Sequence, residues 1–223
     1  MIMVRPTIAF LPEQILHPQP PPKPVPQQAP QQTSAVAGVT PPASSEVVRE
    51  IPVTKPSAGL WKHTFAYGHQ IDINVSPSEV YNYTTDFNLW GTWHEETERV
   101  ELLNSSQLGH DKDNKCYEDI KIKVPVVGYA KDRQEWTVTK AVPPSASNGY
   151  KGVWVIDGHS IAGHDNHTVI EYRVEPSKSG GTTYTRTVRA ENRLIVAGYG
   201  LDSILRSISH NAMVKLKKEL EPK

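Results

Sequence analysis

The sequence predicts an α+β fold in which consecutive antiparallel strands form one sheet and a long C-terminal helix covers its apolar face. Between residues 60 and 193, apolar and polar residues alternate in short runs separated by turns, which is typical of half-buried strands. After Gly200, apolar residues recur at three- and four-residue steps, which indicates an amphipathic helix. Strands joined by short turns pair antiparallel, and such a helix buries its apolar face against the sheet.

Residues 1–57 differ in composition from the rest of the chain. Of the 19 prolines, 13 fall between Pro6 and Pro56, and the stretch 18–32 is rich in proline and glutamine. A segment with so few bulky apolar residues cannot offset the entropy lost on ordering. We therefore predict a disordered Pro/Gln-rich tail at 1–57 and one folded domain at 58–223.

The tail also contains a PxxP pattern, formed by Pro21 and Pro24. A polyproline II segment of this kind is a ligand for SH3- or WW-type grooves, so the tail could bind a protein partner. The alternative, which we favour, is that the tail serves as a spacer.

The folded region begins with a predicted strand from Trp61 to Val75, whose apolar residues share one parity. Ser76 and Pro77 then start a helix, because serine caps a helix N-terminus and proline fits its first position. Glu79 completes a capping box with Ser76.

A second short helix is predicted after Asp86, in the sequence FNLWGTW. Trp90 and Trp93 lie three residues apart, so one short helix presents both indoles to the same surface.

Polar loops rich in glycine, proline, asparagine and serine separate the remaining strands. The predicted strands are Arg99–Leu103, Cys116–Val124, Tyr129–Val142, Tyr150–Asp157, Thr168–Val174 and Thr182–Arg193. The last predicted element is the helix that starts at Leu201 and continues to Leu220, with lysines near its C-terminal end, where cations complement the helix dipole.

Two stretches resemble a known superfamily. INVSPSEVYNYTTDFNLWGTW (73–93) is similar to the opening of START-like, polyketide-cyclase/dehydrase (SRPBCC) proteins, and RLIVAGYGLDSILRSISHNAMVKLKKELE (193–221) is similar to their terminal helix. The resemblance spans about residues 61–221. It implies a helix-grip fold, in which a curved sheet of about seven strands surrounds the helix and encloses a hydrophobic cavity. Members bind lipids, sterols, quinones or aromatic polyketides, and some are cyclases, aromatases or hydrolases.

Strand parity and the apolar face of the helix indicate which side chains would meet such a ligand. We expect the ligand-binding residues to be Trp90, Trp93, Ile120, Ile122, Trp136, Trp154, Tyr172, Tyr184, Ile204 and Ile208, with Val138, Ile156, Ile170 and Val188 on the same inner face.

The same parity turns four polar residues inward, namely Glu118, Asp132, Gln134 and Arg186. A buried charge needs a partner, so we predict that Glu118 or Asp132 pairs with Arg186. The alternative is a bulge that shifts the register and turns these side chains to solvent.

Two functions from different classes follow. The first is binding or transfer of a hydrophobic small molecule without a cofactor. The second is a cyclase, dehydratase or hydrolase with Glu118, Asp132, His94 and Arg186 as catalytic candidates, although for His94 we favour a position on the surface. We favour binding, because the sequence shows no set of nucleophile, base and orienting group. A third possibility is a structural protein whose tail docks elsewhere and whose side chains fill the interior.

Other classes have little support in the sequence. His159, His164, Asp165 and His167 cluster in one predicted turn, but without the ligand spacing of a metal site, so we predict no metal. No GxSxG, HExxH, P-loop or dinucleotide motif occurs, and zero net charge gives no general reason to bind nucleic acid. The single cysteine, Cys116, suits a reducing compartment, and no transmembrane segment or secretory signal is evident, so we expect a cytoplasmic protein.

Overall fold

The computed structural model describes residues 47–57, 62–103, 111–124, 128–161, 166–193 and 200–221. Four features of the sequence analysis therefore lie outside the described residues: the tail up to residue 46, Trp61, His164 and Asp165.

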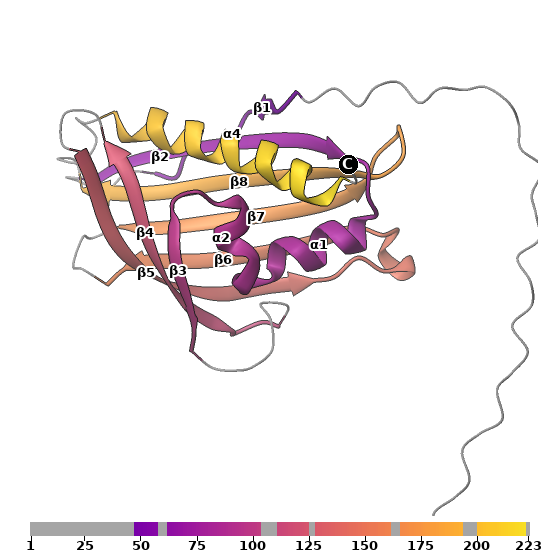
Figure 1. Ribbon diagram of the computed structural model, residues 1–223, viewed down its shortest axis with the longest axis horizontal. Coiled ribbons are helices and arrows are strands. Elements are labelled where there is room, and N and C mark those ends of the chain that lie inside the picture. The colour runs from indigo at the N-terminus through magenta and orange to yellow at the C-terminus, as the bar shows by residue number, and fades with distance from the viewer. Residues whose placement is uncertain are drawn as a thin grey trace, which may run out of the picture. The chain divides into compact units, whose positions relative to one another are not determined.

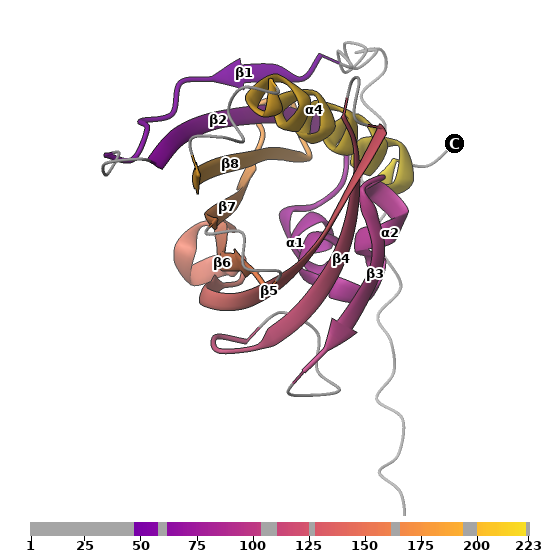
Figure 2. The same cartoon turned by 90° about the vertical axis from the view of Figure 1, so that its left-hand side faces the viewer.

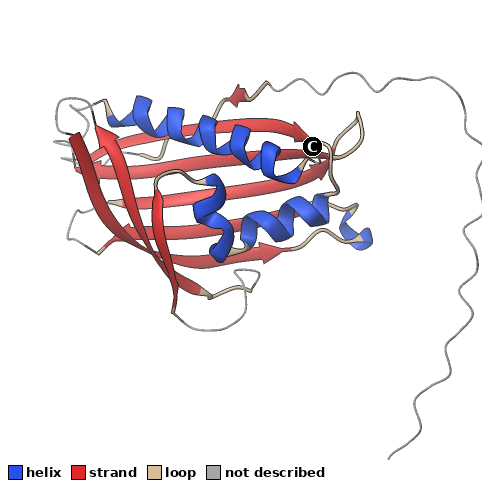
Figure 3. Cartoon of the chain, viewed as in Figure 1, coloured by secondary structure: helices blue, strands red, loops and turns tan. Residues whose placement is uncertain are grey.

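The described elements follow the predicted order of one strand, two short helices, six strands and a long helix, with the additional elements β1, η1 and η2 (Figure 3). In chain order they are β1 (Arg49–Ile51), β2 (Lys62–Ile73), α1 (Pro77–Thr85), η1 (Phe87–Leu89), α2 (Trp90–Trp93), β3 (Thr97–Leu102), β4 (Lys115–Val124), β5 (Gly128–Val142), η2 (Ala146–Asn148), β6 (Gly152–Ser160), β7 (His167–Pro176), β8 (Thr182–Arg193) and α4 (Leu201–Leu220).

The strands form one antiparallel sheet in the order β1-β2-β8-β7-β6-β5-β4-β3. From β3 to β8 each strand pairs with the next in sequence, and β2 closes the meander by pairing with β8. The sheet curves, and α4, α1 and α2 all lie on its concave side (Figures 1 and 2). The predicted α+β fold with a long C-terminal helix is confirmed.

The sheet contains one strand that the sequence analysis did not predict. Residues Arg49–Ile51 of β1 pair with β2 at the sheet edge, so the predicted domain boundary after residue 57 lies C-terminal to an ordered strand. Gly68 makes room for it, because a Cβ at that position would lie 2.6 Å from the Ile51 side chain. A three-residue strand is too short to give an alternating pattern.

The start of α1 shows the capping box that the sequence predicts. Ser76 Oγ accepts a hydrogen bond from the Glu79 backbone N–H at 3.3 Å, and the Glu79 carboxylate accepts one from the Ser76 N–H at 3.0 Å. These bonds satisfy two backbone donors that would otherwise be unpaired. They fix the point at which the chain leaves β2 and turns across the concave face.

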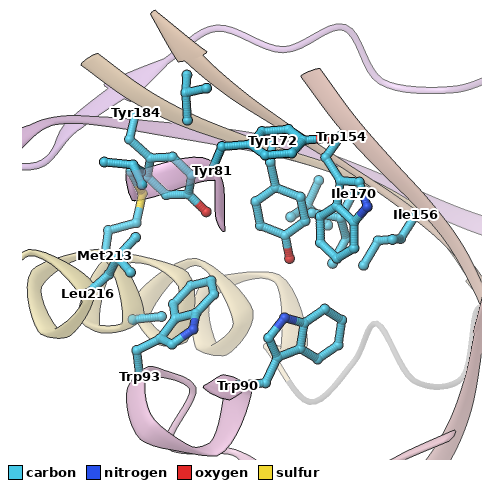
Figure 4. Close-up of a cluster of buried hydrophobic side chains, with 14 of the residues drawn as sticks. Tyr81, Trp90, Trp93, Trp154, Ile156, Ile170, Tyr172, Tyr184, Met213 and Leu216 are labelled. Carbon is cyan, nitrogen blue, oxygen red and sulfur yellow. The ribbon is translucent and has the colours of Figure 1, made fainter. Parts of the chain in front are cut away.

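The second half of α4 packs against the other helices and the sheet in a solid core. Figure 4 shows Met213 and Leu216 of α4 beside Trp93 of α2 and Tyr184 of β8, and all four side chains are fully buried. At the end of the helix, Lys217 donates to the backbone oxygen of Asp72 in β2 at 2.7 Å. No helix in the described part of the chain is long and apolar enough to span a membrane.

Replacing Trp93 with alanine should lower the free energy of unfolding by about 3–5 kcal/mol, because the indole is fully buried and its removal leaves a cavity. Urea unfolding followed by circular dichroism measures this loss. Tyr129→Ala removes an aromatic side chain that is 61% exposed, so it should change the stability by less than about 1 kcal/mol. Equal stability of the two variants would contradict the packing described for α2.

Candidate functional site

A cavity of about 420 Å³ lies between the first half of α4 and the concave face of the sheet. Leu201, Leu205 and Ile208 are its walls on the helix side, whereas Met213 and Leu216, further along the helix, are packed into the core. The helix therefore fills one half of the concave space and leaves the other half hollow.

Apolar side chains make up most of the cavity surface. These are Phe65, Trp90, Ile120, Ile122, Ala130, Trp136, Ile170, Val188, Leu201, Leu205 and Ile208. Apolar walls with a few polar groups are the usual lining of a site for a small organic ligand.

Six of the ten residues expected to bind the ligand line this cavity: Trp90, Ile120, Ile122, Trp136, Tyr172 and Ile208. Three others, Trp93, Trp154 and Tyr184, are fully buried in the packed half of the interior. Ile204 is not among the lining residues. On α4 the cavity meets Leu201 and Leu205 beside Ile208, which belong to the same apolar face of the helix.

The inward-facing polar residues lie at the two ends of the cavity. Arg186 of β8 pairs in register with Tyr172 of β7, next to the packed core. Asp132 of β5 pairs with Ile120 of β4, further from that core. Glu118, Gln134 and Arg186 are all buried, so their side chains face inward as parity predicts. The bulge between β5 and β6 falls after Val138, beyond these positions, and does not reverse them.

Glu118 is held at the inner end by two neutral donors. Thr97 Oγ1 donates to one carboxylate oxygen at 2.5 Å, and Trp136 Nε1 donates to the other at 2.8 Å. Burial raises the pKa of the Glu118 carboxyl to about 7, although these two hydrogen bonds act in the opposite direction. The cavity thus contains a carboxyl group that exchanges its proton near neutral pH.

Asp132 belongs to a separate hydrogen-bond network at the other end. Its carboxylate accepts from Ser160 Oγ at 2.6 Å and lies 3.4 Å from the side-chain nitrogen of Gln134 and 3.5 Å from that of Asn166. These contacts join β5, β6 and the residue that precedes β7. They do not involve Arg186, so they give no support for the expected pairing of Asp132 with that residue.

His94, directly after α2, is buried with 4% of its surface exposed, which excludes the surface imidazole considered above. Its Nδ1 lies 2.9 Å from Glu96 Oε1, while Nε2 is buried without a hydrogen-bond partner in the described part of the chain. Burial lowers the pKa of His94, so the imidazole is neutral. Burial opposes ionisation of Glu96, but its interactions with His94 and Arg186 lower the Glu96 pKa below its ordinary value. The pair is therefore a carboxylate that accepts from Nδ1–H, which leaves Nε2 as an acceptor.

Arg186 is 5% exposed and lines the inner end of the cavity. Its guanidinium carbon lies 5.8 Å from the centre of the Tyr172 ring, and no carboxylate of the described residues lies within ion-pair distance. The structure therefore does not show the expected ion pair between Glu118 and Arg186. The reason is that Thr97 and Trp136 already hold the Glu118 carboxylate.

Tyr67 and Tyr172 place two hydroxyl groups at the same end, one from β2 and one from β7. Burial raises the pKa of each to about 12, so both hydroxyls keep their protons at neutral pH. Tyr67 and Glu96 were not expected at the site. Tyr67 shares its parity with buried residues of β2, which is a usable signal, but Glu96 lies in a turn, where parity gives none.

The histidines near the β6–β7 connection give no metal site in the described residues, where no three potential ligands are grouped. His159 is exposed, and His167 Nε2 lies 2.7 Å from the Asp157 carboxylate.

Sequence comparison assigns the chain to a family. The family described as "Polyketide cyclase / dehydrase and lipid transport" matches residues 65–221, which include every residue described at the cavity. The chain belongs to this family. A search of curated proteins found no match.

Solved structures show the same fold at low sequence identity. A START superfamily protein from Mycobacterium smegmatis has a TM-score of 0.52 and 12% identity, covering 70% of this chain and 96% of that one. Major latex-like protein 151 from Panax ginseng has a TM-score of 0.51 and 9% identity, covering 71% and 99%. An uncharacterized protein from Rhizobium leguminosarum has a TM-score of 0.51 and 11% identity, covering 73% and 97%. At such identities the likeness shows the fold of this polyketide-cyclase family member and nothing more.

The raised pKa of Glu118 predicts a pH-dependent stability. Because its pKa is about 7 in the folded protein and ordinarily 4.5, the folded state binds the proton more tightly than the unfolded state. The stability linked to Glu118 is therefore present in full below about pH 4.5 and is lost as the pH rises to 7. Relative to the wild type, Glu118→Gln should gain up to roughly 3 kcal/mol across this window, because glutamine cannot ionise.

Urea unfolding of both proteins at a series of pH values from 4.5 to 8 measures the difference, in which contributions from unchanged groups cancel. A difference that is constant with pH would contradict the raised pKa of Glu118.

Proposed function

We propose that this protein binds an apolar small molecule, such as a lipid, a quinone or an aromatic polyketide-like compound, and holds or transfers it. The supporting observation is the cavity under the first half of α4, which has apolar walls and is not filled by the protein's own side chains. Burial of apolar ligand surface supplies the affinity, at about 25 cal/mol per Å². Family membership is consistent with this function, since its description includes lipid transport.

The neutral fluorescent probe N-phenyl-1-naphthylamine tests this function directly. Val188→Trp places a large ring in the cavity, whereas Val155→Trp places the same ring on the outward side of β6. We expect the wild type and Val155→Trp to bind the probe alike, and Val188→Trp to bind it at least about tenfold more weakly, because the indole occupies the site. Fluorescence titration measures the affinities. Equal binding by both variants would show that the probe does not enter the cavity.

A second candidate function is a cyclase or dehydratase acting in the same cavity. The favouring observation is the His94–Glu96 pair, in which the imidazole Nε2 has no hydrogen-bond partner among the described residues, together with Glu118, whose pKa is about 7. A neutral imidazole oriented by a carboxylate acts as a general base, and a carboxyl group that is protonated near neutral pH acts as a general acid.

Mass spectrometry of the compounds that co-purify with the protein distinguishes the two functions. If the protein is a dehydratase, the wild type should carry mainly a product, and His94→Gln should carry mainly a precursor that is heavier by one water, because the variant lacks the base. A binding protein should yield the same compound from both preparations, which would contradict catalysis by His94 and leave the binding function intact.

A further inference from the structure

Arg186 is a buried cation of the cavity lining that forms no ion pair with a carboxylate of the described residues. Arg186 Nε and Nη1 are both buried and make no hydrogen bond with any described residue. Burial by itself disfavours the charged form, but Tyr172, Tyr67 and Glu96 around it raise the pKa of Arg186, so the guanidinium remains charged. Leaving such a group unpaired costs several kcal/mol.

The neighbouring acids cannot supply the missing partner in this arrangement. Glu118 is held between Thr97 and Trp136, and Glu96 is held by His94. Both carboxylates act on Arg186 through space, but neither approaches within ion-pair distance of it in the described part of the chain.

The surroundings of Arg186 are rich in donors. The hydroxyls of Tyr67 and Tyr172 keep their protons at neutral pH. Arg186 Nε and Nη1 have no acceptor among the described residues, although the guanidinium also interacts with the Tyr172 hydroxyl. On β4, the inward-facing residues that follow Glu118 are Ile120 and Ile122, so the cavity wall next to these donors is apolar. The cavity therefore matches an amphiphile with an acceptor-rich head and an apolar body.

We propose that the natural ligand carries a carboxylate, and that this carboxylate binds Arg186 at the inner end of the cavity with its apolar part along Ile120, Ile122 and Val188. This inference rests on the proposed binding function and narrows its ligand class to apolar monocarboxylates. Arg186 is then the residue that selects acids over alcohols and hydrocarbons of the same size, since a charge-assisted hydrogen bond is about twice as strong as a neutral one.

Binding of an anion at this position is coupled to a proton on Glu118. The charged and titratable groups near Glu118 are Glu96 and His94 from the turn after α2, Arg186 from β8, Tyr172 from β7 and, on β4 itself, Cys116. The ligand carboxylate is a second anion beside Glu96, and an ionised Glu118 would add further repulsion. The carboxylate therefore binds preferentially to the form of the protein in which Glu118 is protonated. The affinity should therefore be highest below pH 7 and should fall above it.

Displacement of N-phenyl-1-naphthylamine by two competitors of equal chain length, decanoate and decan-1-ol, tests the proposal on the wild-type protein. We expect decanoate to compete at least about tenfold more strongly than decan-1-ol, because only the acid forms a charge-assisted bond with Arg186. Arg186→Gln should remove this preference, and Arg186→Lys should retain part of it. Arg173→Gln, an exposed arginine on β7, is the matched control and should leave the preference unchanged.

The pH arm uses the same displacement assay between pH 6 and 8. Decanoate stays ionised throughout, since an ordinary carboxyl titrates roughly two units lower. Its affinity should fall about tenfold over this range in the wild type, and it should be nearly constant in Glu118→Gln.

The outcomes separate the two proposals. If the probe binds but decanoate and decan-1-ol compete equally and Arg186→Gln changes neither, the carboxylate proposal is overturned and the binding function stands. If the probe does not bind and neither decanoate nor decan-1-ol raises the thermal unfolding temperature of the wild type, the binding function fails, and the carboxylate proposal fails with it. Thermal unfolding of Arg186→Gln shows whether that variant is folded. If it is unfolded, the comparison of decanoate with decan-1-ol on the wild type tests the carboxylate proposal.

Discussion

The position of α4 on the concave face of the sheet is the constraint on which the rest of the interior depends. Its second half is fixed by the packing of Met213 and Leu216 and by the bond from Lys217 to β2. The helix is straight whereas the sheet curves (Figures 1 and 2), so contact at one end leaves a gap at the other. The helices α1 and α2 close the packed end, and the cavity is the space that these contacts leave behind.

Desolvation then determines the protonation states of the acidic groups in the cavity. An acid taken out of water keeps its proton unless donors or cations offset the loss, and the two buried acids have different surroundings. Burial dominates at Glu118, which accepts hydrogen bonds only from the neutral donors Thr97 and Trp136, and its pKa rises although Arg186 acts in the opposite direction. At Glu96, the interactions with His94 and Arg186 together outweigh burial, and its pKa falls. One carboxyl is therefore poised to exchange a proton while the other remains charged, within the same small volume.

Most of the fold could be predicted from the sequence, because its signals are local. The capping box at Ser76 and Glu79 and the apolar periodicity of α4 each involve residues within a few turns, and both are found where the sequence places them. The edge strand β1 could not be predicted, because the feature that permits its pairing is in another segment of the chain. Gly68 of β2 leaves room for the Ile51 side chain.

The candidate site shows where local reasoning ends. Strand parity correctly predicted that the side chains of Glu118 and Arg186 point inward. Parity does not predict which group each side chain then contacts. Which donor reaches Glu118 depends on Thr97 of β3 and on the rotamer of Trp136, neither of which has a sequence signature. Similarly, the apolar face of α4 is wide enough to include Ile204 as well as Leu201 and Leu205, and only the packing of the helix selects the two leucines as cavity walls.

The inner polar group is difficult to explain by stability alone. Apolar side chains of similar size in place of Arg186 and Glu118 would avoid the desolvation cost, and buried ion pairs replaced in this way are often neutral or stabilising. Here the cost is higher, because the guanidinium has no direct ion pair in the described residues and its Nε and Nη1 have no acceptor. Local rules that a protein breaks without compensation in its own structure are typically broken at functional sites. The described residues do not supply this compensation, and under the carboxylate proposal an anion that enters the apolar cavity supplies it.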